Sequence, residues 1–361
     1  QAYSINFLLW SAVAQGGLLF SVVMHITRAR WSSSLAGLAE SFTAFFPVSL
    51  LLFLLLFLGQ SYLFPWRQMD LHGKEVWLNV PFLFARDFIG LIVLYGLGLL
   101  YLYHSLRHKL VFDNPHNPVR ARLNRLWDRG TADRETTRNQ ATVFGILYTL
   151  AFAVVLSLIG YDLVMAMDPH WYSTLFGAYH FIKAVYVGLG GIIILASILH
   201  LHPRCPFQLA DTQFHDIGKL FLAFCLLWAD FFYCQFVVIW YGNISEETAY
   251  IIERTMAQPW QPLAWFVFVV AFIIPFLILI NRRVKQKPGF MSLLCFVVIL
   301  GIWLEHLLLV GPALNPHAIG LPLGLSDGLI FMGFLALVTM AVAGFLSLFP
   351  ELAQTGPGSN E

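Results

Sequence analysis

Nine long apolar runs constrain what this chain of 361 residues can fold into more than any other feature of its sequence. A helix needs about 20 consecutive apolar residues to cross the hydrocarbon core of a bilayer, and each run has about that length. The runs are continuous, whereas strands of a membrane barrel alternate apolar and polar residues. We therefore predict an all-α polytopic membrane protein with nine transmembrane helices. The predicted spans are 5–27, 41–64, 86–104, 142–166, 173–200, 217–241, 261–281, 291–311 and 326–349.

Composition excludes several classes of protein. Hydrophobic residues make up 58% of the chain, charged residues 11%, and the mean hydropathy is +0.72, values outside the range of soluble domains. The net charge of +1 gives no strong field that would favour nucleic acid or an acidic partner. The four cysteines form no C-x-x-C or C-x-x-C-H motif, which excludes the usual iron–sulfur, zinc and c-type haem signatures. We expect the chain to bind no redox cofactor of its own.

The Lys and Arg residues predict the orientation. Of 21 such residues, 16 fall in the connections after the first, third, fifth and seventh spans, four fall in the opposite connections, and Lys183 lies inside a span. Basic loops stay in the cytoplasm, so the loops near 167–172, 242–260 and 311–325 are predicted to be external. Nine spans then leave the first residue outside, and we expect one more N-terminal span, the tenth, in the full-length protein.

Two polar segments lie on the predicted cytoplasmic side. Residues 105–141 form the longest polar connection, and we interpret them as an amphipathic arm or a solvated loop near anionic lipid. Residues 350–361 are interpreted as a flexible tail. Inside the seventh span, Pro275 is expected to kink the helix.

Ionisable residues inside the apolar runs mark the candidate functional site, because a charge at the bilayer centre costs several kcal/mol unless it faces protein or water. At 1.5 Å per residue, Lys183 lies about 15 Å and Asp230 about 20 Å into the bilayer from opposite sides, so the two could pair. His180 shares a helical face with Lys183, and Tyr233 shares one with Asp230. Two interpretations remain open: a pair that joins two helices, and a relay that moves protons.

Further candidates lie nearer the external boundary. Glu305 and His306 are adjacent in the eighth span and should point to different faces. Asp162 could be a hydrated cap or part of a relay, and Arg86 with Asp87 is expected to form a boundary ion pair. The proton-path candidates are Asp162, Asp168, His170, His180, Lys183, Asp230, Tyr233, Glu246, Glu247, Glu305 and His306.

A second chemistry is open for the histidines. His180 and His306 are the only deep imidazoles that could hold a b-type haem. Neither is followed by a second histidine on the same helical face at the spacing that a multi-haem cytochrome b would show. The abundance of phenylalanine, 33 residues, is explained by lipid contact and would also suit a quinone. The uncharged segment 311–325, rich in Pro and Gly, is expected to pack against another subunit.

Three stretches of the chain resemble one family. Together they resemble the ActF family, NrfD-like (polysulfide-reductase-type) membrane subunits of bacterial alternative complex III, over most of the chain. The stretches are Met167-Asp-Pro-His-Trp-Tyr-Ser-Thr-Leu-Phe-Gly177, Ile239-Trp-Tyr-Gly-Asn-Ile-Ser-Glu-Glu-Thr248, and Thr27-Arg-Ala-Arg-Trp-Ser32 with Glu40.

The resemblance implies one integral membrane domain with two four-helix bundles, 1–166 and 167–325, and a last helix, 326–349. It implies a bacterial inner-membrane subunit of a respiratory quinol:cytochrome c (or other acceptor) oxidoreductase, itself non-catalytic, that supports assembly and proton translocation. Quinone binding is possible within that role. From the family's motifs, Asp162, Asp168, His170, Glu246 and Glu247 carry over.

The implied partners hold the redox centres. They are an NrfD-like subunit with the quinol site, an iron–sulfur subunit, multihaem cytochrome c subunits and, in some assemblies, a terminal oxidase. Two other classes stay open: a free-standing ion or solute transporter, and a membrane anchor that binds b-type haem.

Overall fold

The computed structural model describes residues 1–29, 31–71, 73–110, 117–128 and 133–354, and every element in these ranges is a helix. Nine helices of the described part are long and apolar enough to cross a membrane, which confirms the predicted all-α polytopic class. The spans are α1 (Ala2–Ile26), α2 to α3 (Ser33–Leu58), α5 (Val80–Lys109), α7 to η3 (Arg134–Met167), α8 (Phe176–Leu201), α9 (Asp211–Gly242), α11 to α12 (Trp260–Ile280), α14 (Pro288–Leu314) and α15 (Leu325–Leu348).

Short elements join or interrupt the spans. They are α2 (Ser33–Glu40), η1 (Ser41–Phe45), α3 (Phe46–Leu58), α4 (Gln60–Leu63), η2 (Pro65–Gln68), α6 (Pro118–Asp128), α7 (Arg134–Leu163), η3 (Met165–Met167), α10 (Ser245–Thr255), α11 (Trp260–Phe268), the π-helix η4 (Val269–Ile273), α12 (Ile274–Ile280), α13 (Arg282–Lys285) and η5 (Pro350–Ala353).

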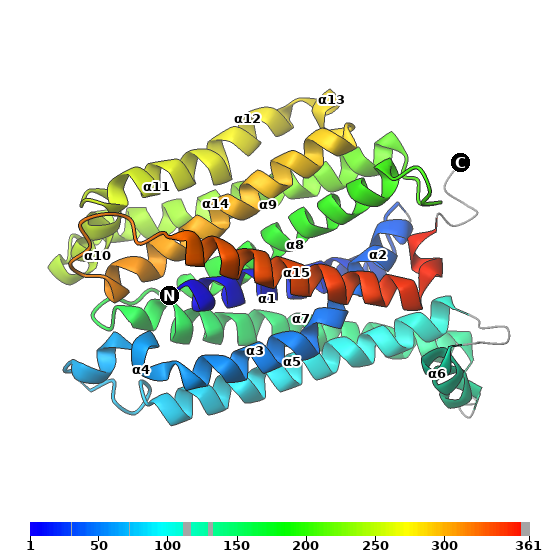
Figure 1. Cartoon of the computed structure of the whole chain (residues 1–361), viewed down its shortest axis with the longest axis horizontal. Coiled ribbons are helices and arrows are strands. Elements are labelled where there is room, and N and C mark those ends of the chain that lie inside the picture. Colours follow the sequence, from blue (N-terminus) through cyan, green and yellow to red (C-terminus); the bar gives the residue numbers. More distant parts are fainter. Residues whose placement is uncertain (30, 72, 111–116, 129–132, 355–361) are drawn as a thin grey trace.

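The spans run side by side along the long axis of the molecule (Figure 1). We call the end that carries α6 and α13 the basic end, on the right of Figure 1, and the end that carries residues 167–172 and α10 the hinge end, on the left. Most of the Lys and Arg residues outside the spans lie at the basic end.

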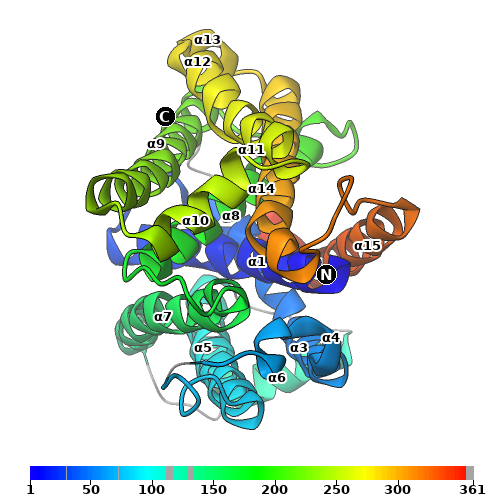
Figure 2. The same ribbon diagram turned by 90° about the vertical axis from the view of Figure 1, so that its left-hand side faces the viewer.

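Two groups of helices meet at the centre of the molecule. The first contains α1, α3, α5 and α7, and the second contains α8, α9, α11 to α12 and α14 (Figure 2). Helix α1 packs against α8 between the groups, and α15 packs against α1 and η1. A Cβ atom on Gly16 would lie 2.0 Å from the carbonyl oxygen of Ala184, and one on Gly188 would lie 2.4 Å from the carbonyl carbon of Gly16. This central crossing therefore needs glycine on both helices.

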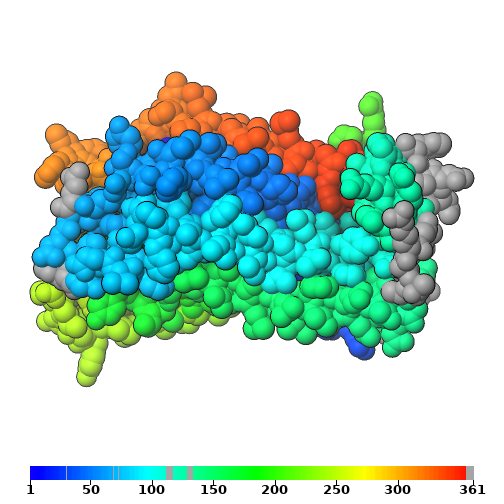
Figure 3. All heavy atoms as spheres, turned by 90° about the horizontal axis from the view of Figure 1, so that it is seen from below, coloured from blue at the N-terminus to red at the C-terminus, as the bar shows by residue number. Residues whose placement is uncertain are grey.

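The outer face of the first group is apolar. Figure 3 views it directly, with α3 in blue, α5 in cyan and α7 in green. Leu51, Leu58, Ile89 and Leu150, one or two on each of these helices, are all more than half exposed. Exposed leucine and isoleucine along whole spans are what contact with lipid tails requires.

Pro275 acts on the seventh span through a π-helical turn. Proline has no backbone N–H, and its ring excludes the ordinary helical bond to the carbonyl four residues earlier, that of Ala271. The helix passes this point as the π-helix Val269–Ile273. The carbonyl oxygen of Ala271 instead accepts from the Tyr186 hydroxyl at 3.1 Å and from the Cys225 thiol at 3.7 Å. Neighbouring spans thus satisfy the backbone that proline leaves open.

The described parts of the segments interpreted as an arm and a tail are largely helical, and residues 111–116 and 129–132 of the arm lie outside the described residues. Helix α5 continues to Lys109, α7 begins at Arg134, and α6 lies between them. The predicted free tail from residue 350 is too broad, because η5 packs against α2 with Leu352 buried, and Arg120 pairs with Glu351. The remainder of that prediction, residues 355–361, lies outside the described residues.

Candidate functional site

Five polar side chains meet between two spans of the second group. We call them the α8–α14 cluster: Tyr179, His180, Lys183, Glu305 and His306. None of them is more than 3% exposed. At 1.5 Å per residue, Lys183 and Glu305 lie about 10–14 Å from the hinge ends of their helices, which places them well inside the bilayer core.

Lys183 pairs with Glu305. The Lys183 Nζ atom lies 3.2 Å from Glu305 Oε1 and 5.0 Å from the centre of the Tyr179 ring. The Tyr179 hydroxyl donates to the same Glu305 oxygen. The buried ammonium and carboxylate therefore compensate each other, as buried charges must.

The cluster also contains buried polar atoms that have no hydrogen-bond partner in the described part of the chain. The rings of His180 and His306 are perpendicular, with centres 6.3 Å apart, and the Nδ1 atom of His306 forms a 2.9 Å hydrogen bond with the carbonyl oxygen of Ile302. Glu305 Oε2, His180 Nδ1 and His306 Nε2 are buried without a partner among the described residues. Buried polar atoms are normally paired, so three such atoms within one cluster of five side chains mark a place suited to exchangeable protons.

Helix α10 connects the cluster with the hinge end. Tyr250 interacts electrostatically with both Glu305 and Asp168. The Arg254 guanidinium stacks 3.5 Å above the Tyr250 ring, and its Nη1 atom lies 3.9 Å from Asp168 Oδ2. The Trp171 ring also stacks on the Tyr250 ring, with the two ring centres 3.8 Å apart. Burial raises the pKa of Tyr250 to about 12, so its hydroxyl group keeps its proton at neutral pH and can donate it to a hydrogen bond.

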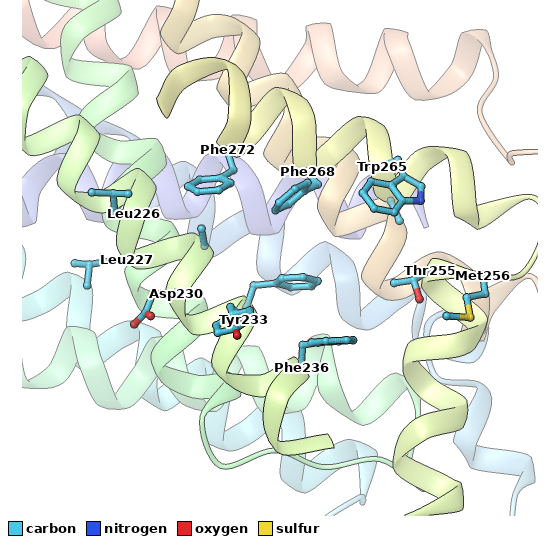
Figure 4. Close-up of a pocket in the computed structure, with 13 residues that line it drawn as sticks. Leu226, Leu227, Asp230, Tyr233, Phe236, Thr255, Met256, Trp265, Phe268 and Phe272 are labelled. Carbon is cyan, nitrogen blue, oxygen red and sulfur yellow. The ribbon is translucent and has the colours of Figure 1, made fainter. Parts of the chain in front are cut away.

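The predicted pairing of Lys183 with Asp230 is wrong. Helix α9 buries the face that contains Trp228 and Gln235, and Asp230, two residues after Trp228, lies about 200° around the helix. Asp230 and Tyr233 are consequently exposed, on the side of α9 that faces away from Lys183. They line a groove of about 880 Å³ between α9 and α11 (Figure 4).

The walls of this groove are apolar and largely aromatic. Asp230 and Tyr233, with Thr255 at the end of α10, are its polar side chains. The apolar residues around them include Leu226, Leu227, Phe232, Phe236, Met256, Trp265, Phe268 and Phe272.

Asp162 is buried and paired, so the predicted role as a cap at the water boundary is wrong. Arg86 approaches it with two nitrogen atoms, Nε at 2.6 Å and Nη2 at 2.5 Å, and the Trp77 indole donates to it at 3.1 Å. Its side chain is fully buried. The predicted ion pair between Arg86 and Asp87 is therefore wrong. Consecutive residues lie about 100° apart around a helix axis, so the two side chains point in different directions. Asp87 instead points inward, 1% exposed, and its carboxyl group interacts with that of Asp162.

A second polar network crosses the middle of the first group. Ser49 lies 2.7 Å from Ser11 and 2.8 Å from the Tyr95 hydroxyl, which also accepts from Gln15 at 3.1 Å. The Tyr148 hydroxyl donates to the Gln15 carbonyl oxygen at 2.9 Å. These uncharged residues come from four helices, and the sequence prediction missed them.

A third network surrounds Glu40 at the basic end. Its Oε1 atom accepts from Ser21 at 3.0 Å, Ser105 at 2.6 Å and Lys109 at 2.5 Å, and Ser21 also contacts the Tyr101 hydroxyl at 3.1 Å. Glu40 is fully buried. The sequence signal for this site was present, since Glu40 is a lone acid among apolar residues, but it entered only as part of the family resemblance.

The remaining candidates lie on the hinge-end surface. Asp168 is 25% exposed beside Arg254, His170 is exposed, Glu246 is exposed on α10 and Glu247 is half-buried there. Lys74 donates to the carbonyl oxygen of Pro169. These positions are accessible from the surface, in contrast to the α8–α14 cluster.

No arrangement typical of a metal site occurs in the described residues. No three His, Cys, Asp or Glu side chains are grouped closely enough there to hold an ion. The four cysteines are free. No protein-family model matches the chain, and no curated protein is significantly similar to it.

Proposed function

We propose that this chain is a membrane subunit of a respiratory quinol:acceptor oxidoreductase of the alternative complex III type, and that it conducts protons through the α8–α14 cluster. The observation that carries the proposal is the buried pair of Lys183 and Glu305 with open polar atoms beside it. Ionisable groups at this depth are expensive, and they typically mark ion or proton paths.

The geometry suggests how a proton would move. Glu305 accepts a proton at its open Oε2 atom and becomes a neutral acid, still hydrogen-bonded by Tyr179. On the return step it releases the proton through water or the neighbouring imidazoles. Tyr250, between Glu305 and the Asp168–Arg254 pair, offers the next group toward the hinge end. The hinge end is the periplasmic side in this proposal, since the basic connections lie at the other end.

The redox centres belong to partner subunits in this proposal. The chain would join an NrfD-like quinol-site subunit, an iron–sulfur subunit and multihaem cytochrome c subunits in a bacterial inner membrane. The motif between Met167 and Gly177 supports this assignment, because it forms the hinge and supplies Asp168 and Trp171 to the α10 contacts.

Proton release by the reconstituted complex tests the proposal. After quinol addition, Glu305→Gln and Lys183→Met should lower the protons released per electron while the subunits still assemble. Asp216→Asn is the matched control, since this carboxylate pairs with Lys219 at the exposed start of α9. If both cluster variants release protons like the wild type, the path does not run through them.

Copurification separates the proposal from the transporter and haem-anchor alternatives. A tagged chain extracted in mild detergent should bring down haem c and iron–sulfur absorbance in constant ratio. A chain that purifies alone and transports an ion, or that alone shows a b-type haem spectrum, would contradict the subunit assignment.

The groove between α9 and α11 supports an additional role in quinone binding. It combines aromatic walls with one carboxylate and one phenol, which suits a lipid-soluble ring with polar oxygens. Tyr233→Phe should then raise the quinol concentration needed for half-maximal turnover without changing proton release per electron. An unchanged quinol dependence would remove this role.

A further inference from the structure

A polar pocket at the basic end lies outside the proposed proton path. It has a volume of about 520 Å³ and opens where α1, α2, α5 and α7 meet. Its charged and imidazole side chains are Arg28, Lys109, Arg138, His25 and His108. The pocket is large enough for a small polar headgroup.

The pocket carries a clear excess of positive charge. Lys109 is bound to Glu40 at 2.5 Å, so this acid neutralises one of the three permanent cations. Among the described residues, neither Arg28 nor Arg138 forms an ion pair. The charged groups that act on His108 are Arg134, Arg138 and Lys109, all of them cations. The described residues thus leave two guanidinium groups without an anion.

The backbone at Arg28 adds an independent observation. Arg28 has a φ of 54°, the left-handed conformation that favours glycine at the end of a helix. Its N–H donates to the His25 carbonyl oxygen at 3.2 Å, and the next residue, Ala29, donates to that of Met24 at 3.0 Å, which ends α1. Arg28 thus ends the helix in a conformation that favours glycine, and it is one of the residues that line the pocket.

We propose that this pocket binds a phosphate group, carried either by an anionic phospholipid headgroup or by a free phosphate ion. Guanidinium groups bind phosphate through two parallel hydrogen bonds, and basic pockets between transmembrane helices are suited to anionic headgroups. The pocket lies at the ends of the spans, where a lipid can reach it. The inference does not depend on the proposed proton path.

Binding of defined probes to the purified, delipidated full-length chain tests this inference. Native mass spectrometry with added phosphatidylglycerol should show one tightly held lipid. Arg28→Gln and Arg138→Gln should each weaken its binding about tenfold, the effect of losing a charge-assisted hydrogen bond. Arg282→Gln is the matched control, because Arg282 lies at the same end on α13, outside the pocket, and should leave binding unchanged.

Inorganic phosphate distinguishes the two sources. If the site takes free phosphate, millimolar phosphate should displace phosphatidylglycerol from the wild type at constant ionic strength, whereas chloride should not. If it takes only the lipid, phosphate should have no effect. Either result supports a phosphate site, provided that binding depends on Arg28 and Arg138. Equal weakening in the Arg282 control, or no weakening in either pocket variant, would overturn it.

Arg28→Gly separates binding from folding. Glycine relieves the left-handed backbone, so the melting temperature of this variant should equal or exceed that of the wild type. Its affinity for phosphatidylglycerol should nevertheless fall about tenfold. Full affinity in this well-folded variant would overturn the inference.

Discussion

Glu305→Leu should destabilise the protein more than Lys183→Met, although both substitutions break the same ion pair. After Lys183→Met, Glu305 still accepts from the Tyr179 hydroxyl and can take up a proton to become neutral. After Glu305→Leu, the Lys183 ammonium loses its carboxylate partner and keeps, among the described residues, the face of the Tyr179 ring, 5.0 Å away. The two halves of the pair therefore have unequal support.

The magnitudes follow from the burial of both groups. Leaving one buried charge unpaired costs about 3–5 kcal/mol, which is the loss in unfolding free energy expected for Glu305→Leu. A hydrogen bond to a charged group contributes about 1.5–3 kcal/mol, so the bond from Tyr179 should reduce the cost of Lys183→Met to about 1–3 kcal/mol. The double variant replaces the pair with apolar side chains of similar size, so its cost should be at least about 2 kcal/mol below the sum.

A double-mutant cycle measures this coupling directly. Unfolding of the wild type, both single variants and the double variant would be followed by tryptophan fluorescence in mixed micelles at pH 7. Pairs that do not interact are additive to within about 0.5 kcal/mol. Additivity within that limit, or a larger loss for Lys183→Met than for Glu305→Leu, would refute the pairing and its asymmetry.

Three further substitutions test other contacts. Gly16→Ala places a methyl carbon 2.0 Å from a carbonyl oxygen of α8, so folded protein should be lost on size-exclusion chromatography, and a normal elution profile would contradict the close crossing. Tyr186→Phe leaves the Ala271 carbonyl oxygen without its hydroxyl donor and should cost about 1–3 kcal/mol in unfolding experiments; no loss would mean that the bond contributes nothing. Asp162→Asn should cost about 3–5 kcal/mol by removing the carboxylate that the largely buried Arg86 binds through two nitrogen atoms. Recovery of stability in the double variant with Arg86→Met would confirm the pair, whereas additive losses would argue against it.

The sequence predicted the spans well and the side-chain partners poorly. Each predicted span overlaps one helix of the structure, since about 20 apolar residues in succession make a membrane helix whatever its neighbours are. The ends differ by several residues where polar turns continue a helix, as at Lys109 of α5. Arg86 is an example of a wrongly predicted partner, because it pairs with Asp162 on another span and not with the adjacent Asp87.

Part of the candidate site could be found from residue type alone. Lys183, Glu305 and His306 were identified because ionisable groups are rare inside spans, and all three are buried in one cluster. Tyr250 and Arg254 were missed, since both lie in a short polar helix whose sequence does not show that these two side chains are buried. The serine and tyrosine networks of the first group were missed because serine and tyrosine are common in membrane helices. Only the three-dimensional structure shows that these side chains contact one another.

By itself the sequence determined that this chain is a multi-pass helical membrane protein and which of its residues are too costly to leave unpaired in lipid. These properties depend on the residues within a single span, so they can be predicted without knowing which other spans pack against it. The tertiary structure decided which residues meet. Lys183 binds Glu305 and not Asp230 because the rotation of α9 about its axis, fixed by the packing of Trp228 and Gln235, turns Asp230 outward, and helix rotation is set by contacts between spans.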